Sequence, residues 1–195
     1  TAVTQHPCAM RTGRQPTMAV DMPSHGAGIV EEREEPSCRI CLGDEADETL
    51  VSPCFCRGSL QHVHASCALR SFEARGDWRL LSCPACKQEY RGRLGVEVAD
   101  AGRRAVEAQF GPEHCETAGA IESLGNAYGR LGDYRMWKQL LEEALNVLEA
   151  TFGSDHPHVA VTLSNLGAAY SALSKHDRKK ELLERAVCIM ERHYG

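Results

Sequence analysis

Three features are missing from this 195-residue sequence, and each absence argues against a class of protein. The formal net charge is −5, so no general excess of Lys and Arg favours binding to nucleic acid or to an anionic membrane. No apolar stretch approaches the roughly 20 residues that a membrane-spanning helix needs. The N-terminal region lacks the apolar segment of a secretory signal peptide. We therefore expect an intracellular, cytoplasmic protein that could reach a membrane only through sequence not present here.

Composition divides the chain into an arm, a cysteine-rich module and a helical region. Residues 1–36 contain four prolines and an acidic run without a sustained period of 2 or 3.6, which predicts a disordered arm. Residues 37–92 hold seven of the ten cysteines. The remaining residues are rich in Ala, Leu and Glu with helical periodicity, and they divide into a linker with the tail of a partial repeat (93–109) and two repeats (110–151 and 152–195).

Eight residues of the second module have the spacing of metal ligands. Two intervening residues let one tight turn present a pair of ligands to one tetrahedral ion. Eight such ligands predict two structural Zn²⁺ ions, because each site is filled to four and leaves no position for a catalytic water. His62 competes with His64, but only His64 has the two-residue spacing to the next cysteine. The ligand string is Cys38-x2-Cys41, Cys54-x-Cys56, His64-x2-Cys67 and Cys83-x2-Cys86.

This string, with Cys38-Arg39-Ile40-Cys41-Leu42 and Ser52-Pro53-Cys54-Phe55-Cys56-Arg57-Gly58, resembles the RING-CH (RINGv) finger of the membrane-associated RING-CH E3 ubiquitin ligases. The resemblance implies a small α+β fold with cross-braced zinc ions. It also implies that the finger holds a ubiquitin-charged conjugating enzyme (E2) in a reactive pose, with no covalent intermediate and no catalytic side chain. The implied ligand sets are Cys38, Cys41, His64 and Cys67 for one zinc, and Cys54, Cys56, Cys83 and Cys86 for the other.

The same resemblance implies an E2-binding surface that includes Ile40, Phe72, Pro84 and Lys87. Lys87 directly follows the last ligand, where many RING ligases place a basic residue that contacts both E2 and ubiquitin. Ile40 and Phe72 have a second explanation as part of the small core of the module. A helix is expected over residues 65–73.

A repeat is the second strong pattern. Residues 110–151 and 152–193 align at an offset of 42, with fifteen identical positions. Each unit predicts two antiparallel helices, first over 116–131 and 134–150 and then over 157–173 and 177–193. The end of the unit also occurs a third time, earlier in the chain, as Val106-Glu107 and Phe110-Gly111.

The Leu166-Gly167-x-x-Tyr170 and Phe152-Gly153-x-Asp155-His156-Pro157 motifs resemble the kinesin-light-chain type of tetratricopeptide repeat. That resemblance implies all-α helical hairpins with a peptide groove, in which Ser123, Asn126 and Asn165 are the matching polar positions. Ordinary helix-surface residues are the alternative explanation for these three. Because such repeats are usually stable only in sets of about three, we expect further repeats beyond Gly195.

Together the patterns predict an E3 ubiquitin-protein ligase that binds E2 and ubiquitin through its finger and recruits protein substrates through its repeats. The alternative is a non-catalytic zinc-binding adaptor, or a reader of protein tails like the PHD finger, which has the same ligand order. Two observations favour the RING-CH reading. Seven residues separate Cys56 from His64, and Leu81 stands where PHD fingers usually carry Trp.

Overall fold

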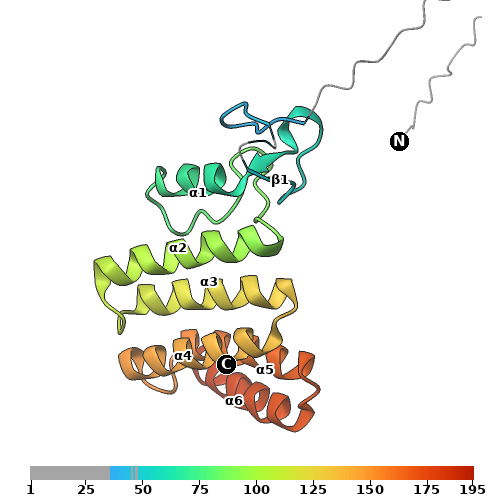
Figure 1. Cartoon of the computed structure of the whole chain (residues 1–195). Coiled ribbons are helices and arrows are strands. Elements are labelled where there is room, and N and C mark those ends of the chain that lie inside the picture. Colours follow the sequence, from blue (N-terminus) through green and yellow to red (C-terminus); the bar gives the residue numbers. More distant parts are fainter. Residues whose placement is uncertain (1–35, 45, 47) are drawn as a thin grey trace, which may run out of the picture. The chain divides into compact units, whose positions relative to one another are not determined.

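The computed structural model describes residues 36–44, 46 and 48–195, so the predicted N-terminal arm lies outside it except for its last residue. Two short strands are followed by helices (Figure 1). Within the described ranges, no helix has both the length and the apolar content to cross a membrane. The elements are β1 (Leu50–Val51), β2 (Val63–His64), α1 (Ala65–Glu73), α2 (Gly92–Phe110), α3 (Cys115–Leu131), α4 (Tyr134–Phe152), α5 (Pro157–Ala172) and α6 (His176–Tyr194).

The cysteine-rich module is a small α+β finger, as predicted. β1 pairs with β2 in antiparallel register, with Leu50 opposite His64 and Val51 opposite Val63. α1 begins directly after β2 and covers the predicted residues. Few apolar side chains are buried here, so most of the finger consists of loops around the cysteine clusters. A module with so little core needs metal binding to supply folding free energy.

The repeat period is visible in the helices themselves. α2, α4 and α6 each contain 19 residues and begin at Gly92, Tyr134 and His176, which are 42 residues apart. α3 and α5 also begin 42 residues apart, at Cys115 and Pro157. All four helices predicted for the two repeats are confirmed to within about two residues at each end. Residues 93–109, predicted as a linker with the tail of a partial repeat, lie within α2, which has the length and position of the second helix of a preceding unit.

Identical residues at the junctions between units have a shared structural role. Phe110 stacks on His114 with ring centroids 4.8 Å apart, and Phe152 stacks on His156 at 4.5 Å. Each histidine caps the helix that follows, because its Nδ1 accepts a hydrogen bond from a backbone N–H of the first turn. The glycine after each phenylalanine has a φ of +88° or +85°, a conformation that few other residues adopt.

Close helix packing explains a second identical pair. A Cβ added at Gly125 would lie 3.3 Å from the Cβ of Leu140, and one added at Gly167 would lie 3.3 Å from the Cδ2 of Leu183. Glycine at this position therefore lets the two helices of a unit approach each other closely. The core between the units is built from leucine and alanine, with Leu141 fully buried at its centre.

The finger packs against α2. Phe72 and Tyr90 of the finger share one hydrophobic cluster with Leu94 and Val98 of α2. A Cβ at Gly102 would lie 3.4 Å from the ring of Phe72, so glycine keeps this contact close. In the preceding unit, α2 is the second helix. A first helix of that unit would stand 42 residues before α3, at about residues 73–89, and these residues belong to the finger. The finger thus covers the face of α2 that such a helix would cover.

Among the described residues, ion pairs and apolar side chains connect the finger to the first complete repeat. Arg79 pairs with Glu116 at the start of α3, and Glu89 pairs with Arg130 near its end at 2.8 Å. Leu81 packs against both hydrophobic clusters of the protein. The finger is therefore held at both ends of α3 as well as along α2.

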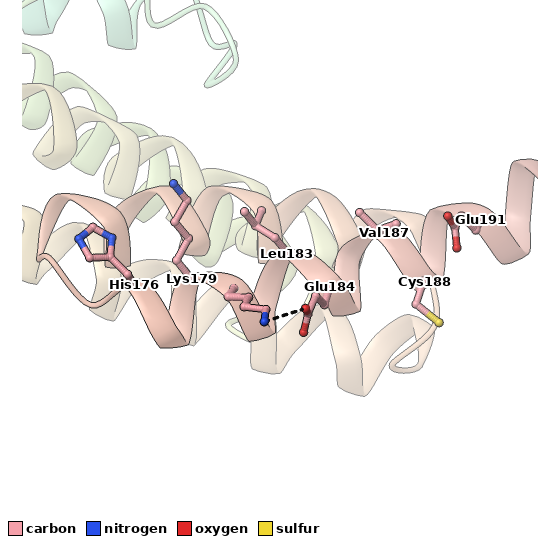
Figure 2. Close-up of a pocket in the computed structure, with 8 residues that line it drawn as sticks. His176, Lys179, Leu183, Glu184, Val187, Cys188 and Glu191 are labelled. Carbon is pink, nitrogen blue, oxygen red and sulfur yellow. Dashed lines mark ion pairs between the residues drawn. The ribbon is translucent and has the colours of Figure 1, made fainter.

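The outward face of α6 carries a shallow depression of about 480 Å³ (Figure 2). Leu183 and Val187 project from this face, flanked by the Lys180–Glu184 ion pair at 3.8 Å. Val187 is 54% exposed, whereas its equivalent one unit earlier, Leu145, is 9% exposed beneath α5. The difference arises because α4 is packed between two neighbouring helices.

Candidate functional site

The finger gathers its cysteines and one histidine into two groups of four. In each group, the sulfur and imidazole atoms lie within 4.8 Å of one another, a spread that suits one tetrahedral ion. One group joins the first and third ligand pairs along the sequence and the other joins the second and fourth, so the groups interleave. The first group is Cys38, Cys41, His64 and Cys67, and the second is Cys54, Cys56, Cys83 and Cys86. These are the sets that the RING-CH resemblance implies.

His64 is oriented as a metal ligand. Its Nδ1 lies 3.3 Å from the Sγ of Cys41 and 3.9 Å from the Sγ of Cys67. Its Nε2 lies 2.9 Å from the backbone oxygen of Asp44, which can only accept a hydrogen bond. The proton of the neutral ring is therefore on Nε2, and the lone pair of Nδ1 is available to a metal. His62 lies outside both groups and contacts Ser52 instead.

Two arginines supply positive charge next to the sulfurs. The guanidinium of Arg39 donates to the Sγ atoms of Cys54 (3.6 Å) and Cys83 (3.4 Å), and Arg70 donates to the Sγ of Cys67 (3.4 Å). Four thiolates around one Zn²⁺ carry a net charge of −2, which a nearby guanidinium offsets. Sequence reasoning missed this role because Arg39 lies 15 and 44 residues from the cysteines that it contacts.

The thiol pKa values of these groups are spread widely. Burial alone would raise the pKa of Cys38, but backbone N–H groups lower it to about 6. Backbone N–H groups also lower the pKa of Cys86 to about 6. Burial, with added contributions from neighbouring cysteines, raises the pKa of Cys56 to about 12. Four close sulfurs cannot all ionise unless a cation lies among them, so this donor set fits a bound divalent metal such as zinc.

Both metal sites are closed, so their function is structural. Three cysteines and one histidine, or four cysteines, fill all four positions of a tetrahedral zinc ion. No position remains at which the metal could activate water. Any activity of the finger must therefore depend on the surface that the two ions hold in shape.

The residues predicted to bind E2 lie in two different environments. Ile40 is 45% exposed although it is apolar, and Pro84 and Lys87 are exposed on the last metal loop. Phe72 is only 4% exposed, and its ring packs against α2 at Gly102. This packing favours the explanation of Phe72 as a core residue, and its place on an E2-binding surface stays a prediction.

The three polar residues of the predicted peptide groove differ in how far their side chains are available to contact a peptide. Ser123 donates to the backbone oxygen of Gly119 at 3.0 Å, within its own helix. The side-chain oxygen of Asn126 accepts a hydrogen bond from Trp137 at 3.1 Å. Asn165 is half-buried on α5. Ser123 and Asn126 thus make hydrogen bonds within the repeat, and their role in a groove stays a prediction.

Comparison with protein families assigns both regions. Residues 38–86 match the family described as RING-variant domain, and residues 116–192 match the family described as tetratricopeptide repeat. The first match covers all eight clustered residues of the finger, and the second covers α3 to α6 almost completely.

Curated relatives match about a third of the chain. E3 ubiquitin-protein ligase MARCHF9 from Homo sapiens is 34% identical over 73 residues, which cover 37% of this chain and 20% of that protein. E3 ubiquitin-protein ligase MARCHF4 from Danio rerio is 38% identical over 56 residues, covering 29% and 13%. The matched stretch therefore spans about one fifth or less of the length of these two relatives.

Among solved structures, the chain is similar to a crystal structure described as kinesin light chain nearly identical TPR-like repeats from Podosopora anserina. The TM-score is 0.48 at 22% identity, and the match covers 66% of this chain and 54% of that chain. The cysteine and histidine groups, the 42-residue helical period and the family matches lead to one assignment. Residues 38–86 are a RING-variant zinc finger that binds two zinc ions, and residues 116–192 are tetratricopeptide repeats.

Proposed function

We propose that this protein is an E3 ubiquitin-protein ligase of the RING type, whose finger binds a ubiquitin-charged E2 and whose repeats recruit protein substrates. The observation that carries the proposal is the combination of closed metal sites with an exposed apolar residue on a metal loop. Ile40 remains 45% exposed in a module that has very few apolar side chains to bury. Such a residue has a clear use as a contact for a partner protein.

The mechanism follows from what the finger can and cannot supply. Its zinc sites are filled to four ligands and have no open position for water. Its contribution is therefore to hold E2 and the attached ubiquitin in a reactive orientation, which lowers the entropic part of the barrier. Lys87 is exposed beside the last ligand, where its ammonium group can donate to a carbonyl of either partner.

Recruitment of substrate is assigned to the repeats. Their helices follow the finger along the chain, and tetratricopeptide repeats typically use an extended helical surface to bind protein segments. A reducing compartment fits the free thiols that the metal sites need, and on this basis we place the protein in the cytoplasm. Similarity to the E3 ligases named above supports the ligase half of the proposal over the matched stretch only.

The test is ubiquitin-chain formation in vitro with the 195-residue chain, activating enzyme, ubiquitin, ATP, zinc and a panel of E2 enzymes. Ile40→Ala should reduce the rate by about 10-fold or more, as expected for a central interface contact. Leu80→Ala is a matched control, because Leu80 is also an apolar residue of the finger and is 47% exposed. Cys38→Ser should abolish activity by removing a metal ligand.

Three outcomes would contradict parts of this proposal. If no E2 supports chain formation while two zinc ions per chain are found, ligase activity is refuted and a zinc-binding adaptor replaces it. If Leu80→Ala reduces the rate as much as Ile40→Ala, the loss does not identify a docking surface. A protein that binds the repeats can also be added to the assay. If ubiquitin is then attached only to the chain itself and not to the added protein, recruitment of substrates through the repeats is refuted.

A further inference from the structure

A second cavity lies where the first complete repeat meets the next one. It has a volume of about 440 Å³ and is formed by the N-terminal half of α3, the end of α4 and the start of α5, with Arg79 of the finger at its edge. Leu148, Phe152 and Val161 make apolar walls. Two acidic residues of α3, Glu116 and Glu122, also line it. This cavity is separate from both metal sites.

Glu122 is a half-buried carboxylate. Its Oε1 accepts a hydrogen bond of 2.6 Å from the hydroxyl of Thr162 on α5. Burial raises its pKa, while the Thr162 hydrogen bond and the charge of His158 lower it. Within the part of the chain that the structure describes, Glu122 has no arginine or lysine partner at ion-pair distance.

The other charged groups of the cavity already have partners. Arg79 pairs with Glu116, and its guanidinium also lies 4.8 Å from the ring of Trp78. Glu116 stands in the first turn of α3, where a negative charge offsets the positive end of the helix dipole. His158 packs edge-on against Phe152 at 5.6 Å. Among the described residues, Glu122 is therefore the acidic residue of this cavity that no arginine or lysine pairs with, and the nearby cationic group is the imidazole of His158.

We infer that this cavity binds the cationic side chain, arginine or lysine, of a protein segment that lies on the repeats. A long side chain of this kind has an apolar stem for the walls and a charged end for the carboxylate. A hydrogen bond between two charged groups is about twice as strong as a neutral one, and partial burial strengthens it further. An acidic segment would place like charges together and is disfavoured.

This site differs from the polar positions Ser123 and Asn126, which make hydrogen bonds within the repeat. It rests on the proposed function, because it names the kind of segment that the repeats would recruit. It also gives the finger a part in recruitment, since Arg79 belongs to the finger and holds Glu116 beside the cavity. Binding at this site needs neither E2 nor ubiquitin, so its failure and the failure of ligase activity are separate results.

The experiment uses two phage-displayed libraries of random 12-residue peptides, one of which lacks Arg and Lys. Both are selected on the immobilised 195-residue chain in the presence of zinc. Selected peptides are synthesised with each arginine replaced by citrulline or each lysine by norleucine, and their affinities are measured by fluorescence polarisation. The proteins compared are wild type, Glu122→Gln, and the control Glu143→Gln, which removes an equal charge from an exposed position on α4.

We expect binders only from the library that contains Arg and Lys. Neutralising the critical side chain should weaken binding to wild type by about 10- to 100-fold, the range for a hydrogen bond to a charged group. Glu122→Gln should cause a similar loss and abolish the difference between the charged and neutral peptides, whereas Glu143→Gln should behave as wild type. Zinc content and circular dichroism verify that each variant is folded.

The inference is overturned if the cation-free library gives binders of equal affinity, or if neither library gives any. It is also overturned if Glu122→Gln still distinguishes arginine from citrulline, because the charge would then be recognised elsewhere. Strong binding of an acidic peptide that depends on Arg79 would reassign the cavity to anionic segments.

Discussion

Leu141 and Leu183 occupy the same position of the repeat but differ in burial, so together they test the fold. Leu141 is 0% exposed and lies in the cluster that joins α3, α4 and α5. Leu183, 42 residues later, lines the depression on the outward face of α6 (Figure 2). Leu141→Ala should cost about 2–5 kcal/mol of unfolding free energy, because it leaves a cavity in a packed core. Leu183→Ala should cost about 1 kcal/mol, since its side chain is already partly in water.

These costs give measurable differences in melting temperature. For a protein of this size, 1 kcal/mol corresponds to about 2–4 °C. Leu141→Ala should therefore lower Tm by about 4–20 °C, and Leu183→Ala by about 2–4 °C. The measurement is far-ultraviolet circular dichroism during thermal and urea unfolding, with zinc present and at two protein concentrations that differ tenfold.

Equal losses for the two variants would refute the reasoning. The outward face of α6 would then be covered in solution, and the burial difference between the two leucines would not hold. A concentration dependence of Tm would identify a second copy of the chain as the cover. Leu145→Ala and Val187→Ala form a second pair with the same relation, and their losses should differ in the same direction.

The features predicted correctly from the sequence are those fixed by local spacing. Two residues between cysteines allow one turn to present both sulfurs, so ligand positions can be recognised without any knowledge of the fold. The helix ends followed from the helical periodicity and the repeat offset, and the structure adds local caps such as His156, whose ring accepts a hydrogen bond from a backbone N–H two residues away. The offset of 42 gave the helix pairs because each identical residue has a local or nearest-neighbour role.

The features that were missed depend on contacts between distant segments. The sequence left Phe72 with two explanations, and its packing against Gly102 of the distant helix α2 favours the core. The contact between Arg39 and Cys83 spans 44 residues. Glu122 meets Thr162 across 40 residues, and only the packing of α3 near α5 makes its carboxylate partly buried. In each case the side chain has an ordinary local sequence, and its role comes from tertiary packing.

Three further predictions concern zinc, packing and pH. Cys38→Ser should reduce the zinc content from two ions to one per chain, measured by atomic absorption, whereas the control Cys188→Ser should keep both ions. Equal zinc content in the two variants would refute the ligand assignment. Gly129→Ala should lower the free energy of unfolding in urea by about 1–3 kcal/mol, because the added Cβ would lie 2.7 Å from the ring of Trp137 on α4. Gly119→Ala should not cause this loss, because the nearest atom to its Cβ would be 3.5 Å away. Burial raises the pKa of Glu122, so the folded state holds that proton more tightly than the unfolded state does. The resulting stability is fully present below the ordinary glutamate pKa of about 4.3 and is lost as pH rises through the raised value. Glutamine cannot ionise, so Glu122→Gln should gain stability relative to wild type as pH rises through this window. If the stability difference between the two proteins does not change with pH, the Glu122 carboxylate is solvated. The cavity would then lack the desolvated charge on which cation binding depends.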